Sequence, residues 1–277
     1  MKQRIVTALW GIPLLLAFVW FDTPWFSPLI FLVAALAALG ALEFYRLAAF
    51  SGGQPLTLFG LVWTLLFIVS ARLDATYEVD YLAPSLLGSA VALPLIWLSL
   101  RPREGALVSW AWTLAGILYV GWMLSHYVAL REEGELDQGR EWVIFALFSA
   151  FACDTAAFFV GRAWGRRSLA PTISPGKTWE GAIGGFIAAP AAALILYTLL
   201  DVAGLSLPLN YAQTILLGCL IGLFAQLGDL SESLLKRRAG VKDSGSLVPG
   251  HGGILDRIDS LVFAGVIVYY YVIWVVE

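Results

Sequence analysis

The stretch from Gln226 to Asp259 reads Q-L-G-D-L-S-E-S-L-L-K-R-R-A-G-V-K-D-S-G-S-L-V-P-G-H-G-G-I-L-D-R-I-D. It concentrates formally charged residues in a chain that is 60% hydrophobic and only 13% charged. Ionisable groups beside a bilayer are expensive unless something pairs with them or binds between them. The stretch therefore predicts a polar ligand held between two hydrophobic segments. The charged residues are Asp229, Glu232, Lys236, Arg237, Arg238, Lys242, Asp243, Asp256, Arg257 and Asp259.

The composition of the whole chain excludes an ordinary soluble domain. Such domains are about 25% charged, whereas this chain of 277 residues has a mean hydropathy of +0.80. A net charge of -3 gives no reason to expect a nucleic-acid partner. The two cysteines, Cys153 and Cys219, lie in apolar runs. They fit neither a disulfide framework nor a zinc site, so we expect small buried hydrophobes.

Hydrophobic segments recur along the chain at lengths that suit a membrane. About 17 to 25 mainly apolar residues cross a bilayer as a helix. This rule predicts an all-α polytopic membrane protein with about nine transmembrane helices and a retained first helix rather than a cleaved signal peptide. The predicted segments are 5–21, 26–50, 56–71, 81–100, 107–130, 142–160, 181–200, 213–228 and 254–276.

The basic residues predict the orientation. With a cytoplasmic N-terminus and nine alternating helices, all of the 17 Lys and Arg residues except three fall on the cytoplasmic side. The three on the outer side are Arg72, Arg131 and Arg140. Basic residues are enriched in cytoplasmic loops. We therefore expect an integral protein of the inner (cytoplasmic) membrane with its C-terminus on the outer side.

The chain is predicted to have two regions. Residues 1–140 form N-terminal transmembrane helices, and residues 141–277 form a C-terminal catalytic transmembrane region. Within the second region, the predicted cytoplasmic loops 161–180 and 229–253 are basic and rich in Gly, Ser and Pro. We expect the chemistry where these loops meet the cytoplasmic surface of the membrane.

The acidic residues of the charged stretch suggest a metal site. If the eighth helix continues beyond the membrane surface, Asp229, Ser233 and Lys236 or Arg237 share one of its faces. Asp256 and Asp259 are three apart at the start of the last helix and project the same way. One or two carboxylates suffice for Mg²⁺, whose other positions are filled by water and phosphate oxygens. The alternative is that these acids only form ion pairs with neighbouring basic residues.

Glycines around His251 fit a backbone that approaches a phosphate closely. Gly252 and Gly253 follow the histidine directly, and glycine has no Cβ to hold an anion away from the main-chain amides. We expect this segment to bind substrate.

Three other polar positions lie outside the charged stretch. Lys177 belongs to S-P-G-K-T, which resembles the end of a P-loop but lacks its first glycine and a preceding strand, so we expect contact with an anion or a lipid headgroup. Asp154 lies in an apolar run and is a functional candidate, with a structural hydrogen bond as the alternative. His126 is expected to pack, and Glu43 to pair with Arg46 or extend to the interface.

The same residues resemble a known signature. The C-terminal stretch resembles that of the phosphatidate cytidylyltransferases (CDP-diacylglycerol synthases) over about 27 positions. Two further stretches resemble this family, 154–162 and 174–181, and the first 140 residues match only as hydrophobic helices. The pattern is Ser233-x-Leu235-Lys236-Arg237-x4-Lys242-Asp243-x-Gly245-x3-Pro249-x-His251-Gly252-Gly253-Ile254-x-Asp256-Arg257-Ile258-Asp259.

The resemblance implies a nucleotidyltransferase that joins CTP and phosphatidate into CDP-diacylglycerol and pyrophosphate, with a divalent metal. It implies a metal on Asp229 and Asp256, with Asp259 as a ligand of a second cation or an orienting group. Cationic side chains would offset substrate charge, and a homodimer is implied. The implied catalytic residues are Asp229, Ser233, Lys236, Arg237, Lys242, Asp243, His251, Asp256, Arg257 and Asp259, and the implied substrate-binding residues are Asp154, Lys177, Gly252 and Gly253.

Two other functions compete with this interpretation. An ion-coupled transporter would use Asp154 and Asp229 as intramembrane cation sites, but it predicts repeats that the sequence lacks. A phosphatidyltransferase that consumes CDP-diacylglycerol would need a D-G-x2-A-R motif, which is absent.

Overall fold

The structure is a computed structural model that describes residues 11, 13–21, 27–77, 79, 81–101, 104–133, 138–247 and 252–276. Two compact units make up the chain. Unit 1 comprises Met1–Glu132 and Leu235–Ile258, and unit 2 comprises Glu133–Leu234 and Asp259–Glu277. The two units are not consecutive in the sequence: Leu235–Ile258, which lies in the predicted C-terminal region, belongs to unit 1.

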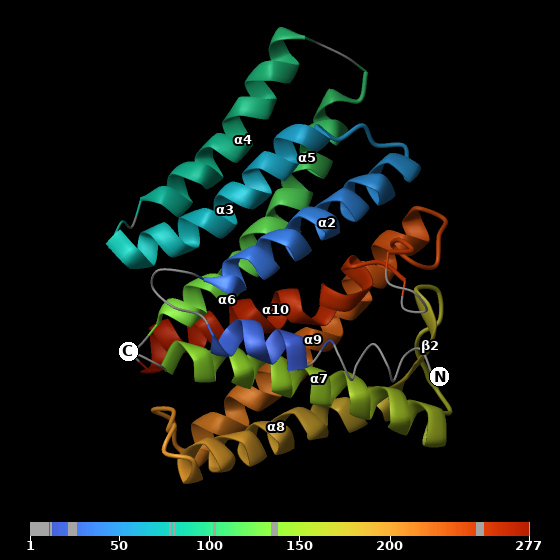
Figure 1. Cartoon of the computed structure of the whole chain (residues 1–277). Coiled ribbons are helices and arrows are strands. Elements are labelled where there is room, and N and C mark those ends of the chain that lie inside the picture. The colour runs from blue at the N-terminus through green and yellow to red at the C-terminus, as the bar shows by residue number, and fades with distance from the viewer. Residues whose placement is uncertain are drawn as a thin grey trace. The chain divides into compact units, whose positions relative to one another are not determined.

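Helices dominate both units (Figure 1), so the all-α prediction is confirmed. Within the described ranges, eight helical segments are long and apolar enough to cross a membrane. They correspond to the predicted segments from the second to the ninth. Of the first predicted segment, 5–21, the structure describes residues 11 and 13–21, and residues 11 and 13–20 are helical. The eight are Pro28–Phe50, Thr57–Asp74, Leu82–Leu100, Ala106–Glu132, Gln138–Trp164, Trp179–Val202, Tyr211–Arg238 and Leu255–Val276.

These segments contain the labelled elements. The fourth segment is built from two α-helices joined by a π-helical turn, and the last segment ends in a π-helical turn. The elements are α2 (Pro28–Phe50), α3 (Thr57–Tyr77), α4 (Leu82–Leu100), α5 (Ala106–Gly116), η1 (Ile117–Trp122), α6 (Met123–Glu132), α7 (Gln138–Trp164), β1 (Ser168–Ala170), β2 (Ser174–Thr178), α8 (Trp179–Val202), α9 (Tyr211–Arg238), α10 (Leu255–Tyr271) and η2 (Val272–Val276).

Unit 1 packs α2 against α3 and α5 around Tyr45. A Cβ on Gly60 or Gly116 would collide with the Tyr45 ring, so small residues let the helices approach. The Tyr45 hydroxyl donates to Thr113 O at 3.0 Å. Arg72 at the end of α3 pairs with Glu132 at the end of α6.

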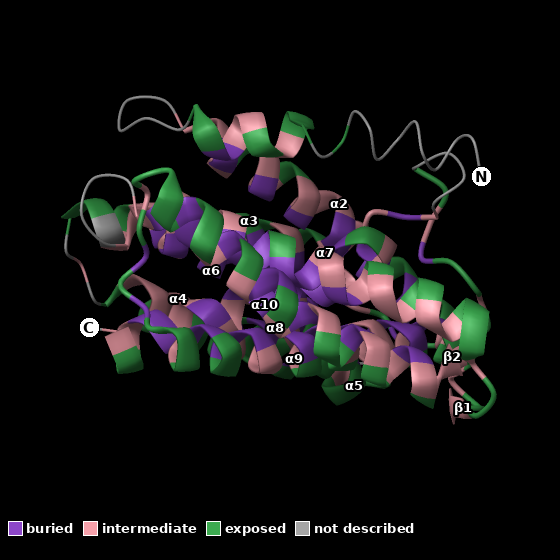
Figure 2. Ribbon diagram, turned by 90° about the horizontal axis from the view of Figure 1, so that it is seen from below, coloured by how far each residue is buried: buried purple, intermediate pink, exposed green. Residues whose placement is uncertain are grey.

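Unit 2 packs α7 along α8. Glycines on α8 face α7 so closely that a Cβ on Gly185 would lie 2.8 Å from Cys153 O. Both cysteines are free; Cys153 is buried, as expected, whereas Cys219 is only partly buried. Figure 2 shows buried and exposed residues alternating around these helices, so each buries one face.

The loop between α7 and α8 is shorter than predicted and carries structure. Helix α7 continues to Trp164, and the following residues form the antiparallel pair β1–β2. The connecting turn places Pro171 at its second position and is closed by Ile173 N donating to Ala170 O at 3.2 Å. The S-P-G-K-T segment is therefore strand β2 itself. Thr178 then caps α8, its hydroxyl accepting from Gly181 N at 3.1 Å.

The second long loop also begins later than predicted. Helix α9 continues from the predicted end near Gly228 to Arg238. Its end is a Schellman motif: Val241 N donates to Lys236 O at 3.0 Å, and Gly240 adopts φ +71°. The expectation that a loop starts at residue 229 was wrong. Because α9 does continue to Arg238, Asp229, Ser233 and Lys236 all lie on this one helix.

Candidate active site

The lysine on β2 meets the first aspartate of the charged stretch within unit 2. Lys177 Nζ lies 2.7 Å from Asp229 Oδ2. Both side chains are partly exposed, at 23% and 35%. The β1–β2 pair positions the lysine, and the extension of α9 positions the aspartate. Lys177 therefore contacts a carboxylate in this structure, and its predicted contact with an anionic substrate stays a prediction.

Asp259 lies within electrostatic range of several other carboxylates of unit 2. Asp259 experiences the charges of Asp229, Glu232 and Asp154. Its own Oδ1 accepts from Ser260 N at 2.8 Å. Carboxylates this close repel unless a cation or a proton relieves them. Of this group, sequence analysis gave Glu232 no role, although it is fully buried on α9.

Asp154 has a structural partner. Ser260 Oγ donates to Asp154 Oδ2 at 2.7 Å, which joins α7 to α10 within unit 2. The sequence left open a structural hydrogen bond as the alternative role of Asp154, and Ser260 of the neighbouring helix α10 makes that bond. Asp154 also belongs to the carboxylate group, so it combines a packing contact with a charge near Asp259.

In unit 1 the other aspartate of α10 is surrounded by donors. Asp256 Oδ1 accepts from Lys236 Nζ at 2.6 Å, and both side chains are nearly buried. Asp256 Oδ2 accepts from Ser244 N at 2.9 Å, Ser244 Oγ at 2.8 Å and Gly253 N at 2.8 Å. This carboxylate thus fastens the loop after α9 to the start of α10.

The remaining predicted residues differ in exposure. Ser233 is buried on α9, while Lys242, Asp243 and Arg257 are exposed. Arg237 is exposed and its Nη1 donates to Val241 O at 3.2 Å, so part of its guanidinium holds the end of α9. His251 lies outside the described residues.

The glycines of the loop lie against carboxylates of the protein itself, where the sequence predicted a phosphate of the substrate. Gly253 N donates to Asp256. A Cβ on Gly253 would collide with Glu43, and one on Gly252 would lie 2.6 Å from Asp256 Oδ2. Gly252 also has φ +82°, which L side chains rarely adopt. These glycines let carboxylates of the protein approach the backbone.

Sequence analysis missed Glu43 as a site residue. It expected this residue to pair with Arg46 or to extend to the interface. Glu43 is fully buried, and its carboxylate accepts from Ser244, Ile254 and Leu255. Arg46, in contrast, is exposed. The only available signal was a carboxylate inside an apolar helix, which is a functional candidate by default. His126 packs as expected, edge-on to Trp122 with its Nδ1 2.8 Å from Trp122 O.

The described residues can be tested for a fit to Mg²⁺. No cluster of three or more His, Cys, Asp or Glu residues arranged to hold a metal occurs in the described ranges. Mg²⁺ needs only one or two carboxylates when phosphate oxygens complete its shell. The partly exposed Asp229 and the nearby Asp259 meet this need. Among the described residues, Asp256 Oδ1 accepts from Lys236 Nζ, so a cation bound there would share this oxygen with the lysine. Asp229 and Asp256 belong to different units, so their convergence stays a prediction.

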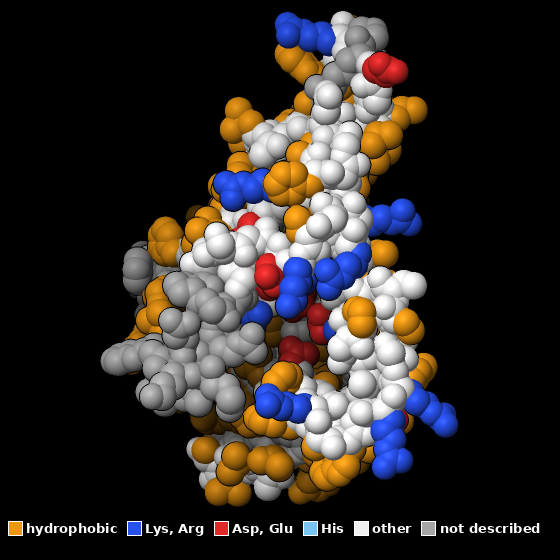
Figure 3. All heavy atoms as spheres, turned by 90° about the vertical axis from the view of Figure 1, so that its right-hand side faces the viewer, with side chains coloured by type: hydrophobic (Ala, Val, Ile, Leu, Met, Phe, Trp, Pro, Cys, Tyr) orange, Lys and Arg blue, Asp and Glu red, His pale blue; other side chains and the backbone are white. Residues whose placement is uncertain are grey.

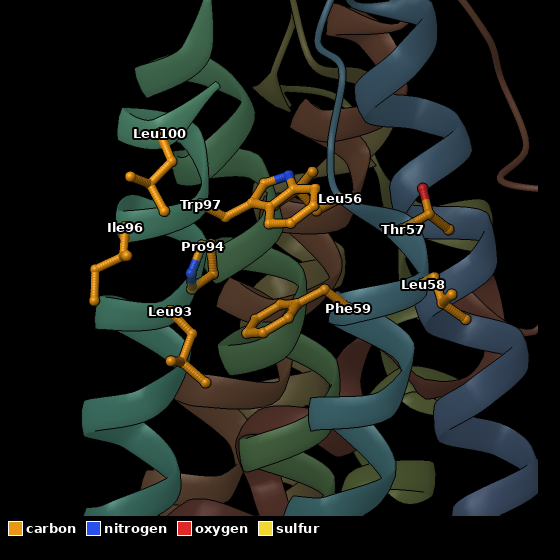
Figure 4. A pocket seen from close by; sticks show the side chains of 9 residues that line it. All are labelled: Leu56, Thr57, Leu58, Phe59, Leu93, Pro94, Ile96, Trp97 and Leu100. Atoms are coloured by element: carbon orange, nitrogen blue, oxygen red, sulfur yellow. The ribbon is translucent and has the colours of Figure 1, made fainter. Parts of the chain in front are cut away.

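Two hollows have different linings. In unit 1 a groove of about 570 Å³ lies between α3 and α4 (Figure 4), lined by apolar side chains such as Phe59, Pro94 and Trp97 and one threonine. It carries no titratable group and does not locate the chemistry. In unit 2 a hollow of about 500 Å³ is lined by Arg166, Arg167, Trp179, Glu180 and Ile183. Figure 3 shows Lys and Arg side chains next to Asp and Glu side chains on one face.

A comparison with known proteins identifies the family of the chain. The model of the cytidylyltransferase family matches residues 2–275. The chain belongs to the cytidylyltransferase family. The match reaches well beyond the C-terminal half, so the expectation that the first 140 residues share only their hydrophobic character was wrong.

Individual relatives of this cytidylyltransferase carry more specific names. A phosphatidate cytidylyltransferase of Bacillus subtilis (strain 168) is 32% identical over 272 residues, which are 98% of this chain and 97% of that protein. One from Synechocystis sp. (strain PCC 6803) is 33% identical and covers 98% and 96%. One from Brucella suis biovar 1 (strain 1330) is 36% identical and covers 84% and 80%. This cytidylyltransferase is a multi-span integral membrane protein, and no observation favours the transporter or the phosphatidyltransferase.

Proposed function

We infer that the chain is a phosphatidate cytidylyltransferase, which transfers the cytidylyl group of CTP to phosphatidate and serves phospholipid biosynthesis. The observation that carries this conclusion is the family match over residues 2–275, together with relatives of that name that span almost the whole chain. The products are CDP-diacylglycerol and pyrophosphate. The homodimer and a cytoplasmic active site remain predictions.

The reaction needs two polyanions to meet. A phosphate oxygen of phosphatidate attacks the α-phosphorus of CTP, and the bond from that phosphorus to the β-phosphate oxygen breaks as pyrophosphate leaves. A phosphate monoester has a second pKa of about 6, so most of it is a dianion at pH 7 and no general base is required. Positioning and charge neutralisation then dominate, as in other phosphoryl transfers.

Asp229 and Asp259 are the proposed holders of the divalent cation in unit 2. Their support is the group of carboxylates around Asp259 and the partial exposure of Asp229. When bound, Mg²⁺ would offset the charge of the phosphate oxygens. Lys177 lies beside Asp229 and would limit the net negative charge of the group. Asp256 remains a proposed ligand through Oδ1, the oxygen that Lys236 contacts.

Exposed cations of the charged stretch would bind the substrate phosphates. Lys242 and Arg257 are exposed, and Arg237 is exposed beyond its bond to the α9 end. Lys236 is nearly buried against Asp256 and is suited to fixing the loop beside the substrate. Asp154 is proposed to hold α10 through Ser260 and to add its charge to the group.

The function is tested by pyrophosphate release from CTP and phosphatidate in detergent while Mg²⁺ is varied. We expect Asp229→Asn and Asp259→Asn to lower turnover by about 10²–10³-fold, because each removes charge stabilisation at the phosphates. Asp201→Asn is the matched control, since Asp201 is exposed at the far end of α8. Near-normal turnover of Asp229→Asn at low Mg²⁺ would refute the metal assignment. A wild-type protein that releases no pyrophosphate would refute the function.

A further inference from the structure

Glu43 lies within α2, a helix that is otherwise almost entirely apolar, and it is fully buried. A carboxyl group in such a place is costly unless hydrogen bonds satisfy it. Both of its oxygens accept hydrogen bonds from unit 1, and the donors lie more than 200 residues later in the chain. This position was not among the residues that the motif singled out.

Two of the donors are backbone amides at the start of α10. Ile254 N donates to Glu43 Oε1 at 3.1 Å, and Leu255 N donates to Glu43 Oε2 at 2.8 Å. The first amides of a helix have no acceptor within it, and a negative charge is favourable there. Glu43 therefore caps α10 from another helix.

The third donor connects Glu43 to Asp256. Ser244 Oγ lies 3.0 Å from Glu43 Oε2 and 2.8 Å from Asp256 Oδ2. A hydroxyl group has one hydrogen to donate, so the two carboxylates share it. Ser244 N also donates to Asp256 Oδ2, which fixes the serine backbone. The position of one carboxylate is thereby linked to that of the other.

The loop is built to admit the Glu43 carboxylate. A Cβ on Gly245 would collide with Glu43 Oε1, and a Cβ on Gly253 would collide with Glu43 Oε2 and Ser244 Oγ. These glycines flank the segment 248–251 on both sides. The contacts with Glu43 therefore explain why both positions are glycine, and no ligand is needed for the explanation.

We propose that Glu43 is a positioning residue of the cytidylyl transfer, which holds the Ser244 loop and the start of α10 so that Asp256 and Lys236 keep their places. The proposal rests on the role of Asp256 proposed above. Glu43 acts through Ser244 and the two amides, and it touches neither substrate.

The decisive variant is Glu43→Gln in the full-length protein in detergent, which preserves shape but replaces one acceptor oxygen by a donor amide. Partners that orient a metal ligand typically contribute 10–100-fold to activity or metal affinity. We expect kcat to fall about 10–100-fold and half-saturating Mg²⁺ to rise, while KM for phosphatidate stays within about twofold. Glu141→Gln is the matched control, because Glu141 is equally buried but accepts from Arg140 on α7. That control should lower thermal stability without changing the Mg²⁺ dependence.

Ser244→Ala provides a second test that does not depend on Glu43→Gln folding. It removes the shared hydroxyl and keeps the bond from Ser244 N to Asp256. We expect kcat to fall and half-saturating Mg²⁺ to rise, as for Glu43→Gln. The kcat of the double variant should lie only slightly below that of the less active single variant, because both substitutions break the same chain of contacts. The proposal is overturned if both single variants keep kcat and half-saturating Mg²⁺ within twofold of wild type.

Two further proteins in the same assay separate this proposal from the proposed function. An inactive wild-type protein refutes the function itself. An active Asp256→Asn variant refutes the role of Asp256 and the positioning role of Glu43 with it. If Asp256→Asn is inactive while Glu43→Gln is fully active, only the positioning role of Glu43 is refuted.

Discussion

Asp256 in unit 1 and Asp259 in unit 2 are three residues apart on α10, and their surroundings differ in kind. Asp256 accepts four hydrogen bonds, one from Lys236 and three from the loop around it. Asp259 lies among other carboxylates and accepts from the amide of its neighbour Ser260. The first carboxylate fastens the loop after α9 to the start of α10, whereas the second belongs to the group of carboxylates that we propose as a cation site. Spacing on a helix does not distinguish the two uses.

The largest effect on stability is expected from Asp256→Ala. This change removes the Asp256 carboxylate from the nearly buried Lys236 ammonium and from the backbone amides of Ser244 and Gly253, and Ser244 Oγ keeps only Glu43 as its acceptor. Breaking a buried ion pair by removing one partner typically destabilises by about 3–5 kcal/mol. Thermal unfolding in detergent micelles measures the change, with the exposed Asp201→Ala as control. An unfolding temperature equal to that of the control would show that Asp256 does not hold the loop.

A smaller loss is expected from Gly253→Ala. The added methyl group would collide with the Glu43 carboxylate, and overpacking of this kind typically destabilises by about 1–3 kcal/mol. Gly176→Ala is the matched control, because nothing lies within 4 Å of its Cβ position. The same unfolding measurement in a background that carries both Glu43→Ala and Ser244→Ala should show a much smaller loss, because the added Cβ would also collide with Ser244 Oγ. Equal losses in both backgrounds would mean that neither side chain is the obstacle.

The smallest effect on stability is expected from Lys177→Met, because an ion pair as exposed as Lys177–Asp229 contributes only about 0–1 kcal/mol. The substitution should change half-saturating Mg²⁺ measurably, and in the direction opposite to the change that Asp229→Asn causes. Removing a positive charge beside Asp229 strengthens cation binding, so half-saturating Mg²⁺ should fall while Lys177→Arg stays near wild type. A rise in half-saturating Mg²⁺ would indicate that Lys177 does not limit the charge of the unit 2 group.

The amino-acid sequence was sufficient for the membrane helices and for the family. Apolar length determines a membrane helix locally, so the segments from 26 to 276 were predicted within a few residues at most ends. The exceptions were α3, α7 and α9, which continue into more polar sequence. Hydropathy falls there, but Lys and Glu are good helix formers, so an end judged by hydropathy was placed too early.

The candidate site was predictable only in part. The motif identified Asp256, Lys236 and the loop glycines, because they are close in the sequence. It could not identify Glu43, since the contact from Ser244 Oγ to Glu43 Oε2 joins residues 201 apart in the chain. The glycines were interpreted as phosphate-binding because a sequence shows that space is needed but does not show what fills it.

The Glu43 contacts also have a consequence for biosynthesis. Helix α2 is made more than 200 residues before the start of α10, so the nascent chain must keep this carboxyl group in the membrane without the three donors that satisfy it in the finished protein. A charged residue at the centre of an inserting helix costs about 2.5–3.5 kcal/mol, which is an upper bound for Glu43 because it lies beyond the midpoint of α2. That penalty is relieved only when translation reaches the last helix. A ribosome that stops early therefore releases a protein whose second helix is still poorly matched to lipid.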